Sequence, residues 1–330
     1  MNSESADVCV FCRASFNTIP FEPVPVPEPD EPVASPRQPF FLPVSAMSEQ
    51  YYHSSGKASF SGVALSLMGG ATAGFVLAAI YAYFIIFVPF IYVRILGTVG
   101  LGFGVGWATA YALSLGKIRN MKVAYSLIGA VSLITLYSAW VMWIYGLLDR
   151  EGEMVSFWAV ALQPWVVWDI MRSLNTTGVW SLKGTEVSGV VLWVVWAIEA
   201  LIILGFIFVN GVKVIDGVPF CETCLTWSLR DPAVLELSGL GNPELLSRVR
   251  AKDYAFLRAA PRRRGDDVSW VRFDVFRCEH CSQLNVLKVN EVIFTVDNRG
   301  QTWEKSSIIL DNLLISPSEL GVLQQISSGR

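Results

Sequence analysis

The sequence is short of charged residues, and long stretches of its middle contain none. Only 16% of the 330 residues are Asp, Glu, Lys or Arg, while 53% are hydrophobic and the mean hydropathy is +0.46. Soluble globular domains carry charge at about a quarter of their positions. The shortage excludes an ordinary soluble globular chain and indicates a protein that prefers lipid.

Histidine is equally scarce, because His53 and His280 are the only two. Neither a Ser-His-Asp arrangement nor a His-rich metalloenzyme signature fits so few histidines. We therefore predict no catalytic residue, and an enzyme is not the expected class. No signal peptide is expected either, since the first residues are acidic and the first apolar run starts near residue 62.

The uncharged stretches are long enough to cross a membrane. Runs of 36, 22 and 26 uncharged residues lie between Lys57 and Arg94, between Arg94 and Lys117, and between Lys122 and Asp149. Only Glu199 interrupts a fourth stretch, 187–212. About 20 apolar residues span the hydrocarbon core, and the buried helices of a large soluble protein seldom reach that length without charge. We predict an α-helical multi-pass membrane bundle at 57–210, with transmembrane helices near 62–87, 95–115, 123–147 and 188–210.

The segment between the third and fourth helices is rich in tryptophan but too often interrupted to span. Trp158, Trp165 and Trp168 stand among scattered charges, and Pro164 breaks the apolar run. Indole rings are favoured at the level of the lipid headgroups. We expect an interfacial segment at 154–174, with a re-entrant hairpin as the alternative.

The first 56 residues contain nine of the sixteen prolines and seven acidic against two basic residues. Such a composition favours extended polyproline conformations and cannot form a packed core. We predict a disordered, acidic tail over 1–56, either a plain spacer or a docking peptide. Cys9 and Cys12 form a Cys-x-x-Cys pair here, whose role stays open between a vestigial half-site, a zinc site shared with another chain, and redox chemistry.

Cations near the helix ends indicate the orientation. The connection between the second and third helices contains Lys117, Arg119 and Lys122, and the cytoplasmic side of a membrane protein carries the excess of Lys and Arg. Placing this connection inside puts both termini in the cytoplasm. Free cysteines point the same way, because a reducing compartment keeps thiols available for metal. We expect an integral protein of the cell or inner membrane.

Small residues recur every four positions along the first predicted helix and include Gly70 and Gly74. The second helix carries two Gly-x-x-x-Gly pairs, Gly100 with Gly104 and Gly102 with Gly106. Because lipid supplies no hydrophobic drive between helices, small residues that let backbones approach provide the packing energy. We expect the first two helices to cross closely at these glycines.

Glu199 is the one carboxylate near the middle of a predicted span. Ionisable groups at that depth are expensive, so they either handle protons and cations or form a specific hydrogen bond inside the bundle. Both interpretations stay open. Arg94 follows Pro89 and Tyr92 at the predicted outer turn, where we expect it to reach the interface as an anchor.

Two Cys-x-x-Cys pairs in the C-terminal third carry the most specific chemistry. Cys221 with Cys224, and Cys278 with Cys281, each present two sulfurs at the spacing that one tight turn can aim at an ion. This pattern resembles the zinc-ribbon family, which implies a tetrahedral Cys₄ site for structural Zn²⁺. The 53 residues between the pairs exceed the family's usual spacing, so the module must contain an insertion. His280 lies within a turn and is expected to be a bystander.

The surrounding segment, 211–330, predicts a small cytoplasmic α+β domain. Residues 268–276 alternate like a strand, 291–296 and 306–310 form a predicted hairpin, and helices begin at Pro243 and Pro317. The stretch 248–277 holds nine basic residues against four Asp. Anionic lipid headgroups are a possible partner for it, a solvated face is the plain alternative, and nucleic acid is not expected.

Three classes of function follow from these patterns. The first is a scaffold or regulatory membrane protein whose zinc domain recruits a protein partner. The second is a transporter or channel subunit that depends on Glu199. The third is a membrane thiol oxidoreductase that uses the Cys-x-x-Cys pairs, although neither C-terminal pair opens a helix of the kind that lowers a thiol pKa.

Overall fold

The computed structural model describes residues 50–88, 91–178, 181–182, 185–213, 217–296 and 301–328. All of them belong to one compact unit, Ser45–Arg330. The proline-rich run and the pair Cys9 and Cys12 lie outside the described residues, so the expectations for them stay predictions.

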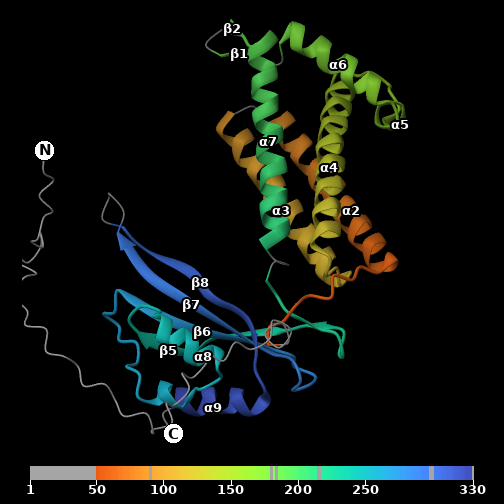
Figure 1. The fold of residues 1–330 in the computed structure, drawn as a ribbon. Coiled ribbons are helices and arrows are strands. Elements are labelled where there is room, and N and C mark those ends of the chain that lie inside the picture. The colour runs from red at the N-terminus through yellow and green to blue at the C-terminus, as the bar shows by residue number, and fades with distance from the viewer. Residues whose placement is uncertain are drawn as a thin grey trace, which may run out of the picture. The chain divides into compact units, whose positions relative to one another are not determined.

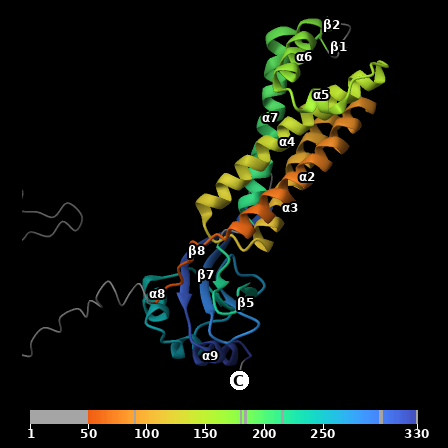
Figure 2. The same ribbon diagram turned by 90° about the vertical axis from the view of Figure 1, so that its right-hand side faces the viewer.

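Four long helices form a bundle, visible in Figures 1 and 2. They are α2 (Phe60–Phe87), α3 (Ile91–Leu115), α4 (Met121–Arg150) and α7 (Gly189–Lys213). By length and composition, all four are able to cross a membrane. The four predicted helices are therefore confirmed as helices, and most of them begin a few residues earlier than expected.

The bundle leaves apolar faces open. Within the most apolar 18-residue stretch of α2, only 22% of the residues are buried inside the protein. The share for α7 is the same. Met68, Ile80 and Leu201 are among the large side chains on the open faces, each at least 60% exposed. A helix that is apolar all round needs a second apolar medium beside its protein neighbours, which supports the expectation of a bilayer.

The stripe of small residues on α2 is its buried face, and it packs chiefly against α4. A Cβ atom on Gly74 would overlap the Thr135 hydroxyl, and one on Gly70 would come within 2.8 Å of Val131. Gly104 of α3 meets α2, because its Cβ would lie 3.1 Å from Leu77. These glycines thus occupy positions of close helix approach.

The glycine pairs of α3 differ from the expectation in one respect. A Cβ atom on Gly100 would meet no described atom within 4 Å, so Gly100 does not serve the predicted crossing. The neighbouring pair instead packs on α7: a Cβ on Gly102 would lie 2.7 Å from Phe206, and one on Gly106 would lie 2.9 Å from the Ile207 carbonyl. A repeat of four residues identifies a helix face but not which neighbour it meets.

Two short helices, α5 (Phe157–Ala161) and α6 (Pro164–Thr177), connect α4 to α7, together with a small hairpin of β1 (Ser181–Leu182) and β2 (Thr185–Glu186). The Tyr137 hydroxyl donates to the Ala161 carbonyl at 2.9 Å, which ties α5 to α4. Val167 is buried, whereas Trp165 is 64% exposed. The two-sided character of α6 is what an interfacial helix requires.

The C-terminal part forms an antiparallel sheet in the order β5-β6-β7-β8 (Figure 1). Its strands are β5 (Leu229–Ser238), β6 (Ser269–Arg277), β7 (Asn285–Val296) and β8 (Thr302–Leu314). The remaining elements are β3 (Phe220–Cys221), β4 (Thr226–Trp227), α8 (Pro243–Arg250), the 3₁₀ turn η2 (Ala255–Arg258) and α9 (Pro317–Ser327). Ser316 and Glu319 cap α9 reciprocally. The predicted sheet-and-helix domain is confirmed.

The segment before α2 joins this sheet, which corrects the expectation that all of 1–56 is disordered. Tyr51 forms an antiparallel bridge with Leu313, and the backbone N–H of Tyr52 donates to the Asn312 carbonyl at 2.7 Å. Residues 50–52 therefore extend the edge of β8. Three residues of sequence were too few to predict this pairing.

Candidate metal centre

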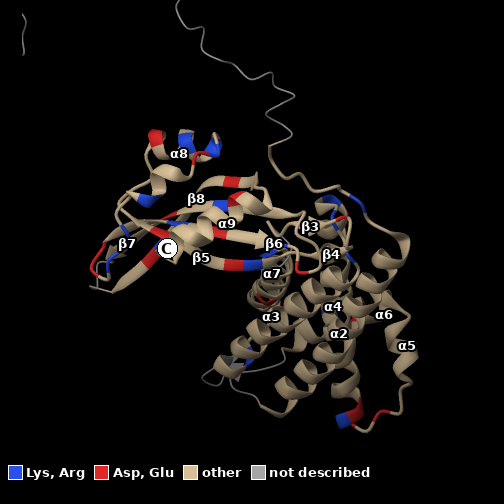
Figure 3. Ribbon diagram, turned by 90° about the horizontal axis from the view of Figure 1, so that it is seen from below, with Lys and Arg blue, Asp and Glu red and all other residues tan. Residues whose placement is uncertain are grey.

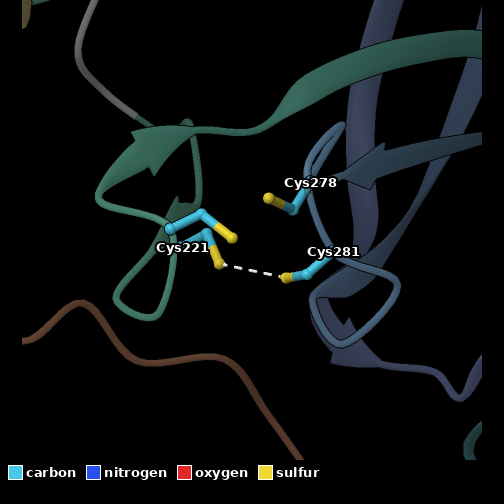
Figure 4. Close-up of side chains that lie close together, drawn as sticks. Cys221, Cys278 and Cys281 are labelled. Carbon is cyan, nitrogen blue, oxygen red and sulfur yellow. Dashed lines mark hydrogen bonds between the residues drawn. The ribbon is translucent and has the colours of Figure 1, made fainter.

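Two tight turns bring together the four cysteines that were predicted to bind metal. Cys221 ends β3, and the chain turns through Leu225, which has a φ of 53°, before β4. Cys278 directly follows β6, and its backbone N–H donates to the Leu284 carbonyl at 3.0 Å just before β7 starts. Figure 4 shows Cys221 facing Cys278 and Cys281 from the opposite turn.

Strand pairing explains how pairs so far apart in sequence meet. The chain between them forms β5, α8, η2 and β6. Leu229, shortly after the first turn, pairs with Arg277, the residue before Cys278. The insertion between the two cysteine pairs therefore begins and ends at the same end of the sheet, which places the two pairs side by side.

The sulfur geometry fits a single ion. The four Sγ atoms lie within 4.8 Å of one another, and those of Cys221 and Cys281 are 3.6 Å apart. Thiolates about 2.3 Å from a tetrahedral Zn²⁺ would be about 3.8 Å apart, whereas a disulfide bond is about 2.05 Å long. All four cysteines are free thiols. The cluster can hold a metal ion.

Backbone N–H groups point at the sulfurs in the same way in both turns. Those of Cys224 and Thr223 donate to Cys221, and those of His280 and Cys281 donate to Cys278. Burial raises the pKa of Cys221, which these donors oppose. Burial also acts to raise the pKa of Cys278, but its donors lower that pKa overall. Donors aimed at sulfur favour the thiolate, the form that binds metal.

The pKa values of the two partly exposed thiols, Cys224 and Cys281, shift in opposite directions. The backbone N–H of Gln283 and the Cys224 thiol lower the pKa of Cys281 to about 7. Donating to Cys281 raises the pKa of Cys224 to about 12. Cys281 can therefore lose its proton near neutral pH. His280 is exposed and stands outside the sulfur cluster, as expected of a bystander.

The first turn also contacts the end of the helix bundle, which the sequence did not reveal. Arg119, between α3 and α4, places Nη1 2.6 Å from Glu222 Oε2, and its guanidinium lies 4.5 Å from the centre of the Phe220 ring. The indole N–H of Trp227 donates to the Ser114 carbonyl at 2.9 Å. That carbonyl belongs to the last turn of α3 and also accepts from the backbone N–H of Lys117 at 3.1 Å.

Within the bundle, Glu199 is paired with Arg94. The Glu199 Oε1 atom lies 2.6 Å from Arg94 Nε, although that contact lacks hydrogen-bond geometry, and Arg94 Nη2 donates to Oε2 at 3.0 Å. The side chains are 16% and 20% exposed. Arg94 is therefore the counter-ion of Glu199 rather than only an interface anchor. The sequence offered one signal for this ion pair, because Arg94 and Glu199 are isolated, oppositely charged residues in two separate helices.

Tryptophans surround this ion pair. The rings of Trp140, Trp143 and Trp196 meet edge to face, with centroids 5.0 to 6.4 Å apart. The Arg94 guanidinium lies 5.9 Å from the Trp143 ring centre. A cavity of about 30 Å³ remains beside the pair, which is room for a single water.

About half of the basic residues in 248–277 are paired with carboxylates of their own domain. Figure 3 shows basic and acidic residues interspersed there. Arg263 pairs with Glu236 at 3.0 Å, and Arg277 pairs with Asp231. Arg272 lies 3.5 Å from Asp274. Lipid binding by this stretch stays a prediction, with fewer free cations than the sequence suggests.

These features define the class of protein: four apolar helices, each able to span a membrane, followed by a sheet domain with four cysteines placed to hold a metal. Neither a protein-family model, nor a curated protein, nor a solved structure matches the chain significantly.

Proposed function

We propose that the chain is a multi-pass integral membrane protein in which structural Zn²⁺ joins a cytoplasmic domain to the inner end of the helix bundle. In this role it is a scaffold or regulatory protein whose cytoplasmic domain recruits a protein partner. The observation that carries the proposal is the convergence of four cysteine sulfurs at a turn that itself contacts the bundle.

The donor set favours zinc. Four thiolates in a tetrahedral arrangement suit Zn²⁺, and four protein ligands leave no open position for a substrate, which is typical of a structural site. When bound, the ion would cross-link the turn at Cys221 to the turn at Cys278. Cys221 and Cys224 lie in the turn that contacts Arg119 and Ser114, whereas Cys278 and Cys281 continue the main sheet. The ion would therefore fix the sheet relative to the bundle.

Elemental analysis of the full chain purified in detergent tests the metal. We expect one zinc per chain in the wild type and less than a tenth of that in Cys278→Ser, because three thiolates bind far more weakly than four. The matched control is the Cys9→Ser, Cys12→Ser double variant, which should keep its zinc. A folded wild type that is free of metal would contradict the proposal.

Protease protection in sealed membrane vesicles tests the orientation. Lys57, Lys117, Arg119, Lys122 and Lys213 all flank the same end of the spans, which supports a cytoplasmic location for that end and for both termini. Tags at the two ends should be cleaved only in vesicles that expose their cytoplasmic face. Cleavage of either tag in vesicles of the opposite orientation would contradict this topology.

The other two expectations gain no specific support. Arg94 engages the Glu199 carboxylate, which gives that residue a structural reason to lie in a span. The four described cysteines share one cluster rather than forming separate redox pairs. Neither a transporter nor an oxidoreductase is favoured by a contact in the described part of the chain.

A further inference from the structure

A cavity of about 310 Å³ lies where the sheet domain meets the helix bundle. We refer to it as the seam cavity. Residues from four separate parts of the chain line it, among them Tyr52, Arg119, Val218, Phe220, Trp227 and Asp311. Its volume is at the lower end of the range for pockets that bind small molecules.

The seam cavity is at the depth of the lipid headgroups if the helices span a bilayer, a premise that rests on the proposed function. The α3 span ends at Leu115 and the α4 span begins at Met121, so Ile118 and Arg119 lie just beyond the hydrocarbon ends of two helices. The headgroup region adds about 5 to 8 Å on each side of the hydrocarbon core.

Arg119 is the cation in the wall of the seam cavity. Its side chain is only 11% exposed, and its Nε atom is buried without a hydrogen-bond partner among the described residues. Nη1 is engaged by Glu222, so the guanidinium retains donor capacity. The remaining N–H groups of the guanidinium can donate to an oxygen acceptor that enters the cavity.

The surroundings have an excess of positive charge. The exposed side chains of Lys57, Lys117, Lys122 and Lys213 flank the same end of the bundle. The described carboxylates nearby are Glu222, which pairs with Arg119, and Asp311, which lies 3.0 Å from Lys288 Nζ. Each carboxylate is therefore already balanced, and the four lysines leave the site favourable for an anion.

We propose that the seam cavity binds the phosphate of an anionic phospholipid headgroup from the inner leaflet, with Arg119 as its main ligand. Planar guanidinium groups bind phosphate oxygens through paired hydrogen bonds. Tyr52 and Trp227 provide amphipathic walls, and Phe220 an apolar one, that suit the glycerol region. Because Phe220 precedes Cys221, the bound lipid would lie beside the metal centre.

Native mass spectrometry of the zinc-loaded full chain, equilibrated in detergent with phosphatidylglycerol or phosphatidylcholine, tests this proposal. We expect one phosphatidylglycerol retained per chain in preference to phosphatidylcholine. Arg119→Gln should weaken retention about tenfold or more, as expected for lost hydrogen bonds to a charged group. Glu222→Gln should strengthen it, because the guanidinium is freed from its competing carboxylate. A purely structural role for the Arg119 and Glu222 pair would instead weaken retention in both variants, and that result would overturn the proposal.

Lys213→Gln is the matched control, since it removes one exposed cation from the same end of the bundle without changing the wall of the seam cavity. Equal losses in Lys213→Gln and Arg119→Gln would overturn the proposal in favour of general surface charge. Val218→Phe narrows the cavity and keeps Arg119, so it should also weaken retention; retention unchanged in this variant would overturn the assignment of the lipid to this cavity.

Inorganic phosphate distinguishes a lipid from a free anion. At equal concentration it should not displace phosphatidylglycerol, because the acyl chains hold the headgroup at the site. Complete displacement would overturn the lipid assignment. The zinc content is measured in the same spectra: a wild type with zinc but no retained lipid refutes this inference alone, whereas a lipid-bound chain without zinc refutes the proposed metal centre alone.

Discussion

The ion pair between Arg94 and Glu199 predicts an asymmetric response to mutation. The two contacts of 2.6 and 3.0 Å hold the charges about 4 Å apart, and an effective dielectric constant of about 20 gives an attraction of about 4 kcal/mol. Removing one member leaves the other unpaired in the bundle. Measured losses for such a truncation in buried pairs are about 3 to 5 kcal/mol.

The asymmetry comes from proton chemistry. A guanidinium keeps its charge in lipid, whereas an isolated carboxylate can be neutralised by a proton. Glu199→Leu, which leaves Arg94 alone, should therefore destabilise the bundle by about 3 to 5 kcal/mol. Arg94→Met, which leaves Glu199 alone, should cost less, about 1 to 3 kcal/mol. The double variant should be more stable than Glu199→Leu, because it leaves no charge behind.

Equilibrium unfolding in mixed micelles, with an ionic detergent as denaturant, measures these differences. Trp143 and Trp196 lie beside the pair and report its integrity by their fluorescence. The double-mutant cycle should give a coupling free energy of about 2 to 4 kcal/mol. Additive losses, with a coupling near zero, would refute the reasoning and show that the contact contributes nothing to the fold.

Three further predictions concern packing and burial, each checked by the same unfolding measurement unless stated. Gly74→Ala should destabilise by about 1 to 3 kcal/mol because its Cβ would overlap Thr135, whereas the matched Gly100→Ala should be neutral or stabilising; equal effects would contradict the assigned faces. Asp274→Ala should cost about 3 to 5 kcal/mol, since this carboxylate is 2% exposed and accepts three hydrogen bonds; a loss under about 1 kcal/mol would contradict it. Burial, reinforced by Glu319, raises the pKa of Tyr254, whose hydroxyl has no partner among the described residues. The unfolded phenol titrates near 10, so the stability from the neutral folded form is complete below about pH 10 and is lost as the pH rises further. Tyr254→Phe should therefore gain about 1 kcal/mol at neutral pH and lose less stability above pH 10, as followed by a pH series; an unchanged pH profile would exclude this cause.

The helices and the cysteine cluster could be predicted because each depends on a local pattern. Uncharged runs longer than 20 residues have few alternatives to a membrane helix, and a Cys-x-x-Cys turn aims its sulfurs by its own geometry. The partners of Arg94 and Arg119 could not be predicted in the same way. Which helices lie side by side depends on the packing of whole faces, and a local pattern does not encode it.

The glycines of α3 show the same limit at finer scale. The repeat correctly marked a surface of close approach, but Gly100 and Gly102 lie only two positions apart and face different directions. The bridge at Tyr51 was missed for another reason. Its pairing is specified by β8, which lies more than 250 residues further along the chain, and the flanking prolines and charges indicated only a tether.

The pairing of Tyr51 with Leu313 has a consequence for biogenesis. During synthesis the residues ahead of α2 emerge before any of the four helices, whereas their partner strand β8 emerges after all of them. All four helices can therefore enter the membrane before this pairing forms. The pairing links the segment before the first helix to a strand that follows the last helix, so the sheet domain can assemble completely only after all four helices have been made.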